Sequence, residues 1–77
     1  MKIEVLGTGC SGCRALYETV QRVVAESGLE ATVVKEEDLG RIISYGVMSL
    51  PALVVDGRVV SAGRRLTPSE VKQLIAR

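Results

Sequence analysis

The two cysteines of this chain stand three residues apart in the motif Cys10-Ser11-Gly12-Cys13, between a short apolar run and a long amphipathic one. Residues 2–6 are typical of a strand that stops at Gly7. From Cys13 to about residue 27, apolar residues recur at helical spacing, and Gly28 suits the left-handed end of such a helix. These positions are Leu16, Val20, Val23 and Val24. The motif therefore predicts a strand, a tight turn and a helix that carries both cysteines in its first turn.

The remainder of the chain alternates further strand and helix patterns. Residues 31–35 are β-branched and predict a second strand. The acidic residues 36–38 precede a short helix that ends at Gly46, and its expected apolar face is Leu39, Ile42 and Ile43. Residues 52–55 and 58–61 predict a hairpin, because Asp-Gly at 56–57 is a strong turn signal.

The last expected helix begins with a well-defined cap. Thr67 is the predicted N-cap, Pro68 stands at the first helical position and Glu70 completes a capping box. The predicted order is β-α-β-α-β-β-α, an α/β fold with a four-stranded mixed sheet and three helices. A chain of 77 residues is long enough for one domain only, over residues 1–77.

Composition excludes several classes of function. Ten basic and nine acidic residues give a net charge of +1, so we expect no nucleic-acid or membrane-surface partner. No histidine is present, which excludes imidazole catalysis. The N-terminus reads as a strand and not as a signal peptide, so we expect a cytoplasmic protein, and nothing suggests an obligate oligomer rather than a monomer.

The spacing of the two cysteines favours redox chemistry. A thiolate is the reactive form of cysteine, and the N-terminus of a helix stabilises an adjacent anion. Cys10 would lie exposed at the helix mouth, with Arg14 adding positive charge, and would act as the nucleophile. Cys13, one turn inside, would be the resolving cysteine that closes the disulfide.

Two alternatives stay open at this point. Two thiolates after a first strand also suit soft Cu(I), as in a metal-carrying domain. The common metal-carrying domain of this size ends in a strand, whereas this chain ends in a capped helix. The third hypothesis is a docking domain that uses the dithiol only as a redox switch.

The segment from Tyr45-Gly46-Val47 through Leu50-Pro51 into the hairpin resembles the cis-proline region of the thioredoxin superfamily. With the Gly-Cys-x-x-Cys start, the chain is similar to the small archaeal and bacterial thioredoxin- or glutaredoxin-like proteins. The resemblance implies a minimal thioredoxin fold and a cis Leu50–Pro51 bond, with the backbone of Leu50 contacting the substrate. It also implies that Gly63 lets the substrate approach. Met48 either lines the substrate groove or fills the core.

The resemblance further implies what surrounds the dithiol. Glu4 matches a buried acid that handles the proton of the resolving cysteine, and Lys35 matches a lysine near that acid. The alternative for Glu4, which the residues alone slightly favour, is a solvated strand residue. Ser11 and Gly12 replace the usual Gly-Pro between the cysteines, so the redox potential does not carry over.

The implied activity is reduction of protein disulfides, with no cofactor beyond the Cys10–Cys13 pair and no metal. An unidentified disulfide reductase would donate the electrons. Arg64 and Arg65 stand where glutaredoxins carry an acidic segment, which disfavours glutathione as the obligate donor. Both are expected on the solvated surface, and the alternative is that they contact an acidic partner.

Overall fold

The computed structural model describes residues 1–75 and has seven elements of regular structure. In chain order they are β1 (Lys2–Leu6), α1 (Ser11–Ser27), β2 (Thr32–Glu36), α2 (Leu39–Ser44), β3 (Ala52–Val55), β4 (Arg58–Ala62) and α3 (Pro68–Ile75). The predicted order of strands and helices is confirmed. The single domain expected over 1–77 includes two residues, 76 and 77, that lie outside the described part.

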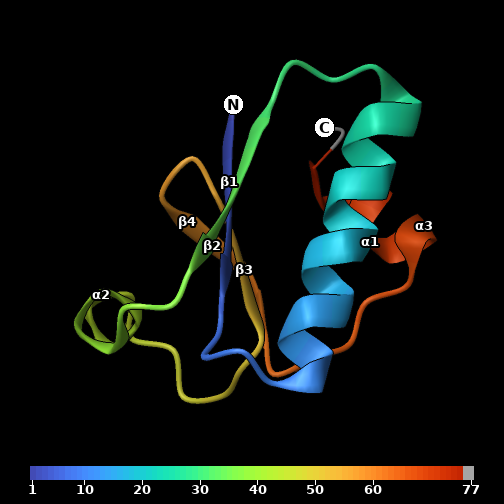
Figure 1. Cartoon of the computed structure of the whole chain (residues 1–77). Helices are drawn as coiled ribbons and strands as arrows, with labels where there is room; N and C mark the ends of the chain where they lie inside the picture. Colours follow the sequence, from blue (N-terminus) through green and yellow to red (C-terminus); the bar gives the residue numbers. More distant parts are fainter. Residues whose placement is uncertain (76–77) are drawn as a thin grey trace.

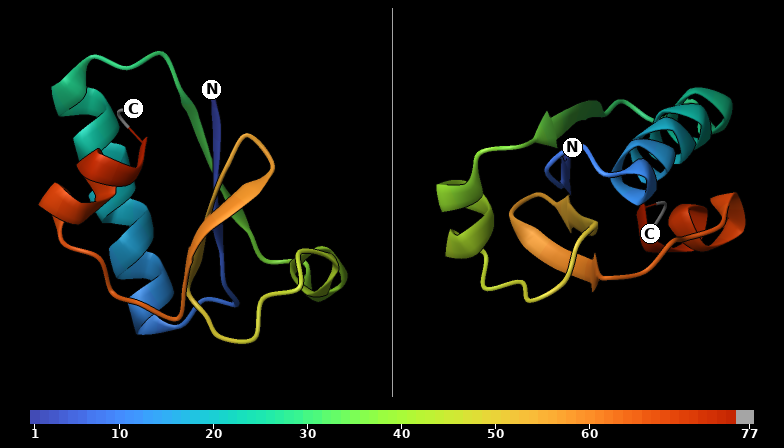
Figure 2. Two further views of the ribbon diagram at one scale, coloured as in Figure 1. Left: turned by 180° about the vertical axis from the view of Figure 1, so that it is seen from behind. Right: turned by 60° about the horizontal axis from the view of Figure 1, so that its bottom comes forward.

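The four strands form one mixed sheet in the order β2-β1-β3-β4. β1 is parallel to β2 because α1 connects them, whereas β3 runs antiparallel to β1 and β4. Helices α1 and α3 lie on one side of the sheet and α2 lies near its other side (Figure 1; Figure 2, right). The β1–α1 turn, the α2–β3 loop and the β4–α3 loop meet near the same end of the sheet.

Side chains of β1 alternate between the two faces, and this divides the core. Ile3 and Val5 join the larger cluster with apolar residues of α1 and α3. Leu6 belongs to a second cluster with Ile42 of α2 and two residues of β3. A strand places successive side chains on opposite faces, so Glu4 shares the α2 face with Leu6.

The ends of the helices follow the predicted local signals. Gly28 ends α1 in the left-handed conformation, with φ of 66°, and its N–H donates to the Val24 carbonyl. At α3 the Thr67 N–H donates to the Glu70 carboxylate at 3.0 Å, and the Glu70 N–H donates to the Thr67 hydroxyl at 3.2 Å. These reciprocal bonds satisfy two donors that the first turn of a helix leaves without intrahelical partners.

The prediction for α2 was partly wrong. Ile42 is buried, but Leu39 and Ile43 are exposed, with relative accessibilities of 59% and 64%. The helix has only six residues, and Ile42 is its one buried side chain. The second strand also begins one residue later than predicted, at Thr32.

Candidate active site

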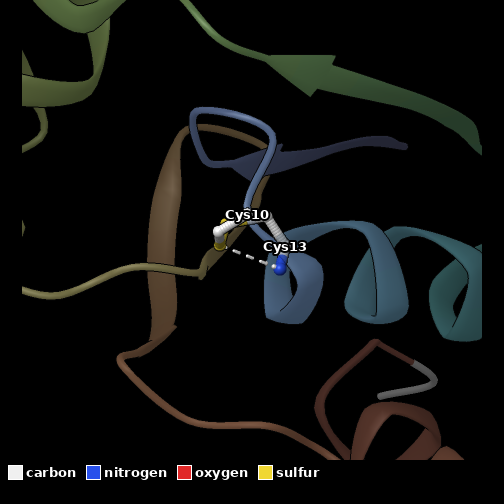
Figure 3. Close-up of a disulfide and its surroundings, with 2 residues drawn as sticks. All are labelled: Cys10 and Cys13. Atoms are coloured by element: carbon white, nitrogen blue, oxygen red, sulfur yellow. Dashed lines mark hydrogen bonds between the residues drawn. A yellow bond between two sulfur atoms is a disulfide. The ribbon is translucent and has the colours of Figure 1, made fainter.

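Cys10 and Cys13 form a disulfide at the beginning of α1 (Figure 3). Cys10 is the N-cap residue, and the Cys13 N–H donates to its Sγ at 3.2 Å. Cys10 is exposed, whereas only 5% of the Cys13 surface is accessible. The positive end of the helix and a first-turn N–H group therefore face the sulfur of the exposed cysteine.

Gly7 makes room for the inner cysteine. A Cβ placed on Gly7 would lie 2.6 Å from the Cys13 Cβ and closer still to its Sγ. The Gly7 N–H donates to the Glu36 carbonyl at 3.0 Å, which fixes the chain as it leaves β1. The backbone at Gly7, just after β1, thus packs directly against Cys13, and a residue with a side chain would not fit there.

Pro51 lies against the other side of the motif. The Leu50–Pro51 peptide bond is cis, and Pro51 is buried. A Cβ on Gly12 would be 3.7 Å from the Pro51 Cδ, so the proline ring borders the turn between the two cysteines. Leu50 packs partly against the α2-face cluster.

Gly63, the residue that follows β4, is hydrogen-bonded to Pro51. Its N–H donates to the Pro51 carbonyl at 2.8 Å, and its φ is 74°. A Cβ on Gly63 would lie 2.6 Å from the Cβ of Ser49, so the space beside this glycine is occupied by the chain itself. Met48 has 96% of its surface exposed, which rules out the alternative that it fills the core.

A small crevice opens on the α1 side beside Cys13, and Arg14 and Lys35 line it together with Glu37. The resemblance placed Lys35 near Glu4, but Lys35 pairs with Val5 and lies on the α1 face of the sheet, opposite Glu4. The Lys35 Nζ lies 4.9 Å from the centre of the Tyr17 ring, a cation–π distance. Ser11 is exposed at the first position of α1.

Glu4 is buried, in agreement with the resemblance and not with a solvated strand residue, but its hydrogen-bond partners lie away from the dithiol. Its carboxylate accepts hydrogen bonds from the Tyr45 hydroxyl and from Arg41 Nη2, the latter at 3.5 Å. Arg41 also forms an ion pair with Glu36. The hydrogen bond to Glu4 raises the pKa of Tyr45, with burial adding to the effect. The structure therefore brings Glu4 to α2 and not to Cys13, which packs on the opposite face of the sheet.

Sequence analysis overlooked Arg65 as a neighbour of the dithiol. A Cβ on Gly12 would be 3.6 Å from the Arg65 Nε, so the guanidinium lies over the turn that joins the cysteines. The Arg65 side chain is exposed, as expected, and it also lies close to the dithiol. No local pattern indicates this proximity, because it depends on how the β4–α3 loop crosses the end of the sheet.

Within residues 1–75, no group of three or more His, Cys, Asp or Glu side chains is arranged to hold a metal ion. Over the same stretch, no helix has the length and apolar character that crossing a bilayer requires.

Comparison with known proteins agrees with this geometry. A family model described as "Thioredoxin domain" matches residues 1–76. A thioredoxin of Methanothermobacter thermautotrophicus is 34% identical over 76 residues, which cover 99% of each chain. A thioredoxin of Methanocaldococcus jannaschii is 34% identical over 71 residues, which cover 92% of this chain and 81% of that protein.

Proposed function

This chain belongs to the thioredoxin family, and from that premise we propose that it reduces disulfide bonds of other proteins with the Cys10–Cys13 pair. The observation that carries the proposal is the asymmetry of the pair. Cys10 is exposed and its Sγ accepts a helix N–H, whereas Cys13, to which it is bonded, is buried. One sulfur is placed to attack a substrate, and the other is placed to attack only the first.

The cycle consists of two exchanges of sulfur bonds. The Cys10 thiolate attacks one sulfur of the substrate disulfide, whose S–S bond breaks as the mixed disulfide forms. The first substrate thiolate leaves and takes up a proton from solvent. After losing its own proton, Cys13 attacks Cys10 Sγ, which forms the intramolecular disulfide and releases the second substrate thiolate. The substrate gains two electrons and two protons, and the Cys10–Cys13 dithiol loses them.

Neighbouring residues would support these steps in different ways. The helix N-terminus and the Arg14 charge favour the Cys10 thiolate. The backbone at Leu50, beside Pro51, is where we expect an extended substrate segment to pair. A separate disulfide reductase would return the electrons. We expect the protein to work as a monomer in a reducing compartment such as the cytoplasm, where a dithiol can be restored.

A redox titration in dithiothreitol buffers, scored by thiol alkylation and mass, tests the proposal. The two cysteines should interconvert reversibly as one intramolecular disulfide, with a midpoint nearer about −270 mV, as in a reductant, than about −120 mV, as in an oxidant. Failure to form the intramolecular disulfide would overturn the proposed cycle.

Single cysteine variants then separate the two roles. Cys13→Ser should accumulate a mixed disulfide with a substrate, because the attack that resolves it is lost. Cys10→Ser should form none, although it retains the buried cysteine. Equal trapping by both variants would contradict the assigned order of attack.

A further inference from the structure

The charges around the dithiol are unevenly distributed. Arg65 lies on the Pro51 side, with its Nε 3.6 Å from the position of a Cβ on Gly12. On the opposite flank, Glu37 Oε2 lies 3.8 Å from the position of a Cβ on Gly9. A substrate that reaches Cys10 therefore passes Arg65 on one side and, on the other, Glu37 together with Arg14 and Lys35, which line the same crevice.

Among the described residues 1–75, Arg65 has no counter-ion, whereas the neighbouring Arg64 has one. Arg64 Nη2 is paired with Glu70 Oε2 at 3.0 Å, at the first turn of α3. Within residues 1–75, no carboxylate lies within ion-pair distance of Arg65. The Arg65 side chain is exposed, so its guanidinium can form an ion pair with an incoming group without first losing one.

Arg65 is placed to contact substrate residues that lie next to the disulfide bond under attack. The Arg65 guanidinium and the Pro51 ring both lie beside the turn between the cysteines, near where the substrate segment is expected. Arginine presents several N–H donors in a planar arrangement that matches a carboxylate. A carboxylate a residue or two from the substrate cysteine would come within reach when Cys10 attacks.

We infer that Arg65 is a specificity residue that favours protein disulfides flanked by an acidic residue. This inference rests on the proposed reductase function. The contribution is that of one exposed ion pair, which corresponds to about a twofold to fivefold preference in kcat/KM and weakens with added salt.

The experiment compares three fluorescent peptide disulfides that differ only beside the cysteine, where they carry Glu, Ser or Lys. With the full-length protein, kcat/KM should follow the order Glu, Ser, Lys, and the differences should shrink as salt is raised. Arg65→Gln should remove most of the ratio between the Glu and Ser peptides. Arg65→Glu should reverse the order, and Arg65→Lys should retain it.

Arg58→Gln is the matched control, because it removes the same charge at the start of β4, the end of that strand away from the dithiol. It should leave the ratio as it is in the unmodified protein. If the Ser peptide is reduced but the three peptides do not differ, the inference fails while the reductase function stands. If both the Arg58 and Arg65 variants lower the ratio equally, net charge and not Arg65 is responsible, and the inference is again wrong. If no peptide is reduced at all, the proposed function fails and the inference with it.

Discussion

Replacing Gly7 with alanine tests the contact between β1 and the inner cysteine. The added methyl would lie 2.6 Å from the Cys13 Cβ, well inside the 3.4 Å at which ordinary van der Waals contact begins. Gly7 has no positive φ, so backbone strain does not contribute and the effect is steric. Overpacking of this kind typically costs about 1–3 kcal/mol of unfolding free energy. We expect a loss in that range, measured by chemical denaturation.

The same variant should also shift the redox midpoint. The clash with Cβ persists in both redox forms, but the clash with Sγ is harder to relieve when that sulfur is bonded to Cys10. The oxidised form should therefore lose more stability than the reduced form, which makes the couple more oxidising. A difference of about 1.4 kcal/mol between the two losses corresponds to about 30 mV.

Gly40→Ala provides the matched control. A Cβ there would lie 3.5 Å from Asp38 Oδ2, an ordinary contact, and Gly40 lies within helix α2. Its unfolding free energy should stay the same or rise by up to about 1 kcal/mol. The steric argument is refuted if Gly7→Ala is as stable as Gly40→Ala, or if its midpoint does not move.

Two further predictions concern the cap of α3 and the α2 face. Thr67→Ala should lower the unfolding free energy by about 1 kcal/mol in denaturant titrations, because the N-cap hydroxyl is lost. The hydrogen bond from the Thr67 backbone N–H, and secondarily that of its side chain, lowers the pKa of Glu70, so this cap stabilises the fold at neutral pH and weakens as the pH falls through that lowered pKa. Thr67→Ala keeps the N–H, so Glu70→Gln is the variant that should show a smaller loss of stability on acidification. The hydrogen bond to Glu4 raises the pKa of Tyr45. The stability that this hydrogen bond adds to the fold is therefore complete below about pH 10 and is lost as the pH rises through the raised pKa. Unfolding measured from neutral to alkaline pH should show this loss in the unmodified protein and not in Tyr45→Phe.

Local sequence signals predicted most of the fold. The spacing of apolar residues in α1, the Asp-Gly turn and the capping box of α3 each act within a few residues, so they could be read without a structure. The burial of the α2 side chains could not be predicted in the same way. Leu39 and Ile43 fit a helical stripe, but how much of that stripe is covered depends on how the short helix lies on the sheet.

The same distinction applies to the site. The cysteines were predictable because helical spacing alone brings residues 10 and 13 together. Arg65 was not, because its contact with Gly12 joins two loops far apart in sequence. The partner of Gly63 likewise could not be read from the chain, since Ser49 reaches it only across the sheet end.

Glu4 is the residue for which the structure most changes the chemical interpretation. A buried carboxylate needs partners, and here they come from α2 and its C-cap residue Tyr45. Tyr45 also begins the loop that leads to Pro51, so the contact with Glu4 ties that loop to the central strand β1. This arrangement makes Glu4 an anchor for the proline loop.

Glu4→Gln separates the anchoring role from proton transfer. Glutamine keeps an oxygen that can accept from the Tyr45 hydroxyl but removes the charge that faces Arg41. If Glu4 is an anchor, the variant should lose stability in denaturant titrations, while Cys13 should resolve a preformed mixed disulfide at the unmodified rate. Resolution is followed by stopped-flow release of a fluorescent thiol across the pH range. A rate that falls at least tenfold, with its pH dependence lost, would instead assign proton transfer to Glu4, because an anchor on the opposite face of the sheet has no reason to change how the rate depends on pH.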